Sequence, residues 1–220
     1  MRELTWLALV AALMAISACS SDDTPTDVPG SGEIVSETRD VSHYNGVRLL
    51  GPGVMKIEHT GTESLAITTD KNLMQFITSE VSNGELIIGI ADAVNALPTI
   101  PILYELAVND LVEITVVGNS SVEDAGINTD SLTVFLSGNG RIVLGGTADY
   151  QEIELRETGT YEARQLRSGV SRVSVRGSAF AIVSVSDTLF AQVFDCGRID
   201  YFGDPAIFQD VSSCGSVKRR

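Results

Sequence analysis

The sequence predicts an all-β fold, a parallel β-solenoid with coils of about 20 residues and an irregular N-terminal cap. Glycines recur 18 to 21 residues apart, at Gly118, Gly138, Gly159, Gly177, Gly197 and Gly215. A branched apolar residue stands four positions before each glycine, at Ile114, Val134, Leu155, Val173, Val193 and Val211. Between these positions polar and apolar residues alternate, as in Ser171–Gly177, which is the pattern of a β-strand.

The length of the repeat favours stacked coils. A strand with a crossover helix needs about 30 residues, so units of this size are expected to stack directly, about 4.8 Å apart. The glycines then mark bends, and the branched residues form a ladder inside the solenoid. A β-sandwich of short strands is the alternative, but it requires no column that recurs once in each unit.

The N-terminal half is less regular and is expected to begin the solenoid and cap its open end. Short strands are predicted at residues 47–50, 54–58 and 65–69. Asp70 is expected to cap a short helix that reaches Ile77. Asn83-Gly84 predicts a β-hairpin, because a type I′ turn requires positive φ at both central residues.

The first 18 residues have the form of a lipoprotein signal peptide. Arg2 precedes an apolar run, Trp6–Ile16, and Ile16-Ser17-Ala18-Cys19 resembles a lipobox. As a helix this run would rise only about 16 Å, less than a hydrocarbon core of roughly 30 Å, which disfavours the alternatives of a transmembrane or buried helix. The sequence therefore predicts lipidation of Cys19 and attachment to the membrane through that lipid.

The rest of the chain is predicted to be a single domain with polar ends. Residues 19–38 are rich in Ser, Asp, Pro and Gly, and are expected to form a flexible acidic tether. Within them Ser20–Asp23 resembles an outer-membrane sorting signal, with a simple solvated linker as the alternative. The solenoid domain is predicted at residues 39–217, and Lys218–Arg220 are expected to form a basic tail.

The net charge constrains the partners. The chain carries a formal charge of −14, and loss of one Arg and one Glu with the signal leaves that value unchanged. An acidic surface repels phosphate backbones, so nucleic-acid binding is not expected. We expect a cell-envelope protein, on the periplasmic side or the surface of the outer membrane, with a glycan or an envelope protein as its partner.

Five segments together carry a family resemblance: Asn45-Gly46-Val47, Asp70–Ile77, Glu80–Ile88, Leu136–Gly140 and Ile199–Pro205. In this order they resemble the putative auto-transporter adhesin, head GIN domain family, over about Arg39 to Val217. The resemblance implies a right-handed parallel β-solenoid in an exported bacterial protein, with no enzyme activity, cofactor or established binding residue. The sequence departs from the glycine-rich pattern at Arg156–Thr160 and Val175–Ala179, where the turns are expected to differ.

Two cysteines occupy matching places in neighbouring units. Cys196 and Cys214 each precede a column glycine. Stacked coils would place them about 4.8 Å apart, inside the range of roughly 4.4 to 6.8 Å between the Cα atoms of a disulfide. An oxidising envelope would favour the bond, which would staple the last coil. Two free thiols that share a column are the alternative.

The sequence favours a non-catalytic module. The only histidines, His43 and His59, lie in no metal-binding pattern and in no sequence suited to a Ser-His-Asp site, so no metal or cofactor is expected. A polysaccharide lyase or hydrolase is the alternative function, because Arg176 or Arg198 could assist carboxylates at Asp149, Asp187, Asp195, Asp200, Asp204 and Asp210. The units of this chain are short, however, and leave little room for loops that would form the walls of a substrate cleft. A binding, adhesion or structural role is therefore expected.

Overall fold

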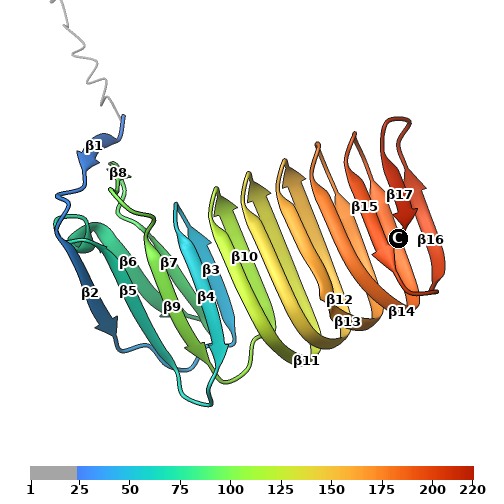
Figure 1. Cartoon of the computed structure of the whole chain (residues 1–220), viewed down its shortest axis with the longest axis horizontal. Coiled ribbons are helices and arrows are strands. Elements are labelled where there is room, and N and C mark those ends of the chain that lie inside the picture. Colours follow the sequence, from blue (N-terminus) through green and yellow to red (C-terminus); the bar gives the residue numbers. More distant parts are fainter. Residues whose placement is uncertain (1–23) are drawn as a thin grey trace, which may run out of the picture.

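The computed structural model describes residues 24–220 and contains a parallel β-solenoid of about five turns (Figure 1), as the sequence predicts. Four long, bent strands form its centre: β11 (Ser121–Gly138), β12 (Arg141–Glu157), β13 (Thr160–Val175) and β14 (Phe180–Val193). Each pairs in parallel with the next. Because they bend, each of these strands contributes its second half to one side of the solenoid, flank A, and its first half to the other, flank B.

Shorter strands complete the two flanks. Flank A also contains β6 (Ile77–Ser82), β7 (Glu85–Ile90), β3 (Gly46–Leu50), β10 (Glu113–Gly118) and β16 (Ala206–Val211). Flank B also contains β2 (Ile34–Arg39), β5 (Ser64–Asp70), β9 (Leu103–Val108), β4 (Val54–His59), β15 (Arg198–Phe202) and β17 (Ser216–Arg219). Antiparallel pairs occur only at the N-terminal end of the described chain, where β2 and β9 flank β5 and β6 flanks β7.

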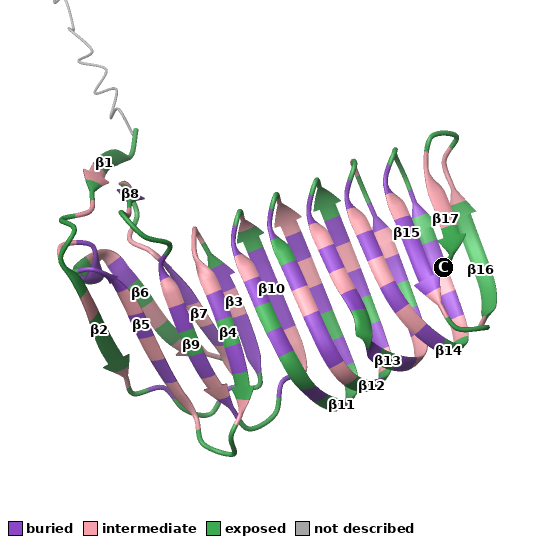
Figure 2. Ribbon diagram, in the orientation of Figure 1, coloured by how far each residue is buried: buried purple, intermediate pink, exposed green. Residues whose placement is uncertain are grey.

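The core consists of side-chain ladders that run along the solenoid axis. Buried and more exposed positions alternate along the strands of the ribbon (Figure 2). One ladder contains Ile114, Val134, Ile153, Val173 and Ala191, and the next contains Val116, Leu136, Leu155, Val175 and Val193. Each of these residues is at most 2% exposed. The single column predicted from the sequence is therefore wrong in register: it mixes two ladders whose residues lie two positions apart and so face the same side of a strand.

The glycine column divides in the same way. Gly118, Gly138 and Gly177 share one corner with positive φ, whereas Gly159, Gly197 and Gly215 lie in the next column. A Cβ on Gly138 would lie 2.2 Å from the carbonyl oxygen of Gly118, so the coils can approach this closely only without a side chain there. Glu157 occupies this corner at φ +64°, which accounts for the departure in the sequence pattern.

The folded domain extends beyond both predicted boundaries. Residues expected in the flexible tether form β1 (Thr26–Pro29), which pairs in parallel with β8 (Val94–Leu97), and β2, which pairs with β5. At the other end Lys218 and Arg219 belong to β17, so the predicted free tail is also wrong. The predicted signal and Cys19 lie outside the described residues. Within residues 24–220, no helix is long and apolar enough to cross a membrane.

The structure confirms the predicted hairpin and corrects the predicted helix. Asn83 and Gly84 have φ of +53° and +82° between the antiparallel strands β6 and β7. After Asp70 only a short 3-10 helix forms, η1 (Met74–Phe76), without a side-chain cap. The buried Asp70 carboxylate instead accepts hydrogen bonds from the backbone N–H of Gly32 at 2.7 Å and of Thr99 at 2.8 Å. It thereby ties the connection between β1 and β2 to the cap.

The two cysteines meet at the last corners of the solenoid. The structure joins Cys196 to Cys214 through a disulfide, with 4.6 Å between their Cα atoms. Both corners lie next to the C-terminal coil, which has no further coil packed on it among the described residues. The disulfide therefore ties the final turn to the turn before it.

Replacing both Cys196 and Cys214 with serine is expected to lower the free energy of unfolding by about 3 kcal/mol, because the link closes an 18-residue loop. Chemical denaturation of the oxidised, reduced and doubly substituted proteins measures the loss. Reduction should reproduce the effect of the double substitution. If reduction leaves the unfolding midpoint unchanged, the thiols are free in the native protein.

Asp70→Asn is expected to destabilise the cap at neutral pH. Burial raises the pKa of Asp70, but hydrogen bonds from Thr99 and Gly32 outweigh burial and hold that pKa below its ordinary value of 3.8. A carboxylate with a lowered folded-state pKa contributes stability above pH 3.8 and loses it as the pH falls through that folded-state pKa. The difference in Tm between wild type and variant should therefore be present at pH 7 and shrink below pH 3.8.

Asp27→Asn is the control, because Asp27 is exposed and, among residues 24–220, accepts a hydrogen bond only from the surface side chain of Asn95. It should change Tm little at either pH. A loss of Tm in Asp70→Asn that stays constant from pH 7 to below pH 3 would contradict a role for the charged carboxylate.

Candidate functional site

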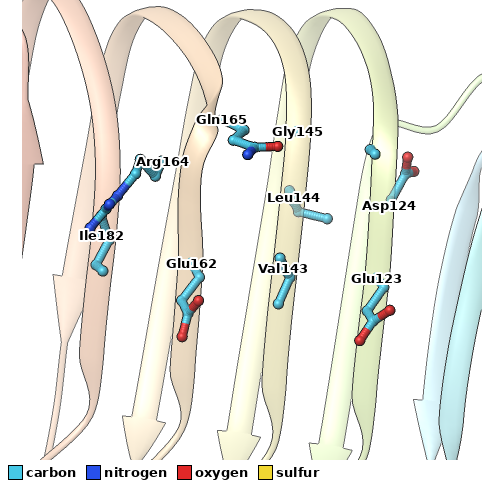
Figure 3. A pocket seen from close by; sticks show the side chains of 10 residues that line it. Glu123, Asp124, Val143, Leu144, Gly145, Glu162, Arg164, Gln165 and Ile182 are labelled. Atoms are coloured by element: carbon cyan, nitrogen blue, oxygen red, sulfur yellow. The ribbon is translucent and has the colours of Figure 1, made fainter.

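A shallow groove crosses the outer face of flank B, close to the bends of the long strands (Figure 3). Its volume is about 490 Å³, and strands β11 to β14 all contribute to it. It is lined by Glu123, Asp124, Ala125, Val143, Leu144, Gly145, Glu162, Arg164, Gln165 and Ile182. The groove therefore spans four successive coils rather than lying within one.

One outward-facing row of the sheet forms most of the groove. Glu123, Val143, Glu162 and Ile182 are partners in successive strands, so carboxylate and aliphatic side chains alternate along it. With rungs about 4.8 Å apart, the two glutamates stand roughly 10 Å apart along the axis. Figure 3 shows Val143 between them. A ligand lying along the axis would meet an acid, an apolar side chain and a second acid in turn.

Irregular pairing beside this row opens the hollow. The register shifts between Asp124 and Ile127, and again between Val143 and Gly145. A β-bulge bends the strand and redirects its side chains, and Gly145 places no side chain over the floor. The groove is thus a consequence of how the coils turn from flank B toward the next side.

Its charged residues are held in different ways. Glu162 forms an ion pair with Arg141 at 2.8 Å, and the Arg164 guanidinium lies 4.7 Å from the centre of the Phe202 ring. Asp124 is buried and binds the His59 ring at 2.8 Å, so it supports the wall of the groove. Glu123 is exposed and forms no ion pair within the described part of the chain. It is the acid best placed to accept hydrogen bonds from a ligand.

The carboxylates selected from the sequence do not line this groove. Asp149 and Asp187 do come together, in a second hollow of about 520 Å³ that also contains Arg167. Gly169 lies between them, since a Cβ there would contact both residues. This pair is the part of the predicted acidic set that the structure brings together.

Three of the other four predicted acids contact neighbouring groups within the solenoid. Asp195 accepts a hydrogen bond from the backbone N–H of Gly177 at 2.8 Å. Asp204 pairs with Arg219 at 2.9 Å, and Asp210 is exposed on β16. Asp200 is buried and forms ion pairs with two arginines, Arg198 at 2.6 Å and Arg220 at 2.7 Å. Corners and strand ends are therefore held by Asp195, Asp200 and Asp204.

The two predicted basic partners are also engaged elsewhere. Arg198 contacts Asp200, and hydrogen bonding to that carboxylate raises the pKa of Arg198 despite partial burial. Arg176 lies 4.1 Å from the centre of the Phe194 ring. Neither residue lines the hollow that holds Asp149 and Asp187. The arrangement of paired acids beside Arg176 or Arg198, which the enzyme alternative required, is therefore not assembled.

The histidines are separated. His43 contacts Ser42 at the surface, whereas His59 binds Asp124. Residues 24–220 contain no group of three or more His, Cys, Asp or Glu side chains that could hold a metal ion. The groove residues Glu123 and Glu162 were not selected from the sequence. Aligning the units by outward position would have revealed them, but only with the register that the structure supplies.

Comparisons with known proteins place this fold in a family. The family model described as "Putative auto-transporter adhesin, head GIN domain" matches residues 43–205. A putative adhesin from Bacteroides fragilis NCTC 9343 is 18% identical, with a TM-score of 0.72 over 88% of this chain and 100% of that chain. A comparison with curated proteins finds no match.

Two structures from Parabacteroides are also similar. A putative lipid binding protein from Parabacteroides distasonis ATCC 8503 is 19% identical, with a TM-score of 0.57 over 89% of this chain and 100% of that chain. A putative adhesin from Parabacteroides merdae ATCC 43184 is 18% identical, with a TM-score of 0.51 over 88% and 99%. At these identities the structures show a shared fold, while the family match covers most of the chain. The chain therefore belongs to the putative auto-transporter adhesin, head GIN domain family.

Proposed function

We propose that this chain is a non-catalytic adhesion module of the cell envelope that holds an extended glycan across the groove on flank B. The alternating row of Glu123, Val143, Glu162 and Ile182 carries the proposal. Membership in an adhesin family supports a role in binding at the envelope or cell surface. The proposal names the ligand class and the site.

The shape of the groove suits a polymer. Sites for small molecules are concave enough to bury most of the ligand, whereas this groove is shallow and crosses four coils. A chain of sugars can lie along it with both ends in solvent. Carboxylates at Glu123 and Glu162 accept hydrogen bonds from hydroxyl groups, and Val143 offers apolar contact to a ring between them.

We further propose that a lipid on Cys19 anchors the protein in the outer membrane. Thr26, the first residue of β1, lies seven residues after Cys19, so the two can be at most about 25 Å apart. The capped N-terminal end of the solenoid would then stay close to the membrane. The C-terminal coil lies at the opposite end of the solenoid (Figure 1) and would face away.

If the groove binds a glycan without catalysis, the protein should retain a glycan and leave it uncleaved. The chain from residue 19 onward, with Cys19→Ser, is applied to a glycan and polysaccharide array that is read for bound protein and for shortened sugars. Glu123→Ala should weaken binding to a retained glycan about tenfold, because it removes a charged hydrogen-bond acceptor. Glu152→Ala on flank A is the control and should bind like wild type. Shortened sugars would support the enzyme alternative instead.

The lipid anchor predicts a single modification site. Cells that express the full chain are labelled with a clickable fatty-acid analogue, and membrane and soluble fractions are separated. Wild type should carry the label in the membrane fraction, whereas Cys19→Ser should lose both the label and the membrane association. Cys196→Ser is the control and should keep the label. Label that persists in Cys19→Ser would contradict lipidation at this residue.

A further inference from the structure

The C-terminal coil exposes two strand edges and apolar side chains. β16 pairs only with β14, and β17 pairs only with β15, so each has one unpaired edge within the described chain. Phe208 on β16 is 59% exposed and stacks on Phe190, and Ile207 beside it is 38% exposed. Unpaired edges of this kind accept another strand through main-chain hydrogen bonds.

Charge is distributed unequally along the solenoid. Residues 24–140 contain 4 basic and 16 acidic residues, a formal charge of −12, whereas residues 141–220 contain 10 of each and are neutral. Two N-terminal ends would therefore repel each other strongly, while two C-terminal ends carry no net repulsion. The exposed strand edges lie at the end where a second copy can approach.

We infer that the C-terminal coil is a self-association surface on which two copies of this chain pair end to end, β16 of each against β17 of the other. The chain reverses direction between the flanks, so a two-fold axis across the terminal coil makes these strand pairs antiparallel. The arrangement is closed, because each copy uses both strand edges that are unpaired at the C-terminal coil of the described chain. The two N-terminal caps then point in opposite directions.

The side chains on the two edges are complementary. Asp210 projects from the outer face of β16, in the row of Gln192, and Lys218 projects from the outer face of β17, in the row of Asp200. Both are exposed. Pairing β16 with β17 brings an acidic edge against a basic one, and it covers Phe208 with the partner strand. If the protein is anchored at its N-terminal end, such pairs would join molecules on facing membranes.

Sedimentation velocity over a range of concentrations tests the pairing, with the chain from residue 19 onward carrying Cys19→Ser. We expect an equilibrium between monomer and dimer that stops at the dimer. Phe208→Ser should raise the dissociation constant at least about tenfold, since each substitution occurs twice in a two-fold interface. Phe194→Ser, which changes an exposed phenylalanine outside every strand, should leave it within about twofold.

A charge exchange provides the second test. Asp210→Lys should weaken the dimer by placing like charges together, and Asp210→Lys with Lys218→Asp should restore it. Monomers at every concentration would overturn the inference, as would growth into longer polymers or a double variant as weak as the single one. The groove takes no part in this contact, so the two proposals can fail separately. A glycan array without binding would not contradict the dimer, and a protein that stays monomeric would not contradict glycan binding in the groove.

Discussion

Parallel pairing between coils is the constraint on which the rest of this structure depends. Since each residue in a long strand lies beside its equivalent one coil away, the same kind of side chain must suit a whole row. Inside, this produces ladders of branched aliphatic residues. One buried row that departs from this pattern contains Leu132, Gln151, Ser171 and Leu189. There the buried Gln151 accepts a hydrogen bond from the Tyr161 hydroxyl at 2.9 Å and donates one to Ser168 at 2.8 Å, so its polar atoms are satisfied.

The same constraint shapes the outer surface. Like charges in adjacent coils would stand about 4.8 Å apart and repel, so a row of carboxylates needs spacers. In the groove, Val143 separates Glu123 from Glu162, and on other rows arginines lie over phenylalanines of neighbouring coils. The alternation that we assign to ligand binding therefore also has a structural cause. What distinguishes the groove is the hollow that the bulges and Gly145 add to that row.

The repeat made the solenoid predictable, but it did not determine the register. Leu155 and Ile153 both face the core, so a pattern of alternation accepts either one as the partner of Val134. The predicted N-terminal boundary of the domain was wrong for a different reason. β1 and β2 are exposed edge strands with few apolar residues, and they are held by pairing with β8 and β5, which lie far along the sequence. Asp70 holds only the connection between them, through the backbone N–H of Gly32. From composition alone, such a segment is predicted to be a linker. The groove was missed because it depends on the register of four coils together.

A solenoid has no intrinsic end, because every coil presents the same unpaired edges as the one before it. The two ends of this solenoid differ in strand direction and in charge. At the N-terminal end the strand direction reverses in β5 and β6, and most of the acidic residues lie in that half, which opposes association of strand edges. At the C-terminal end the strands stay parallel and the charges balance. Neither of these protections is present where Phe208 is exposed. The disulfide between Cys196 and Cys214 fixes the last coil in place, and an edge that is held rigid loses less conformational entropy when a second strand docks on it.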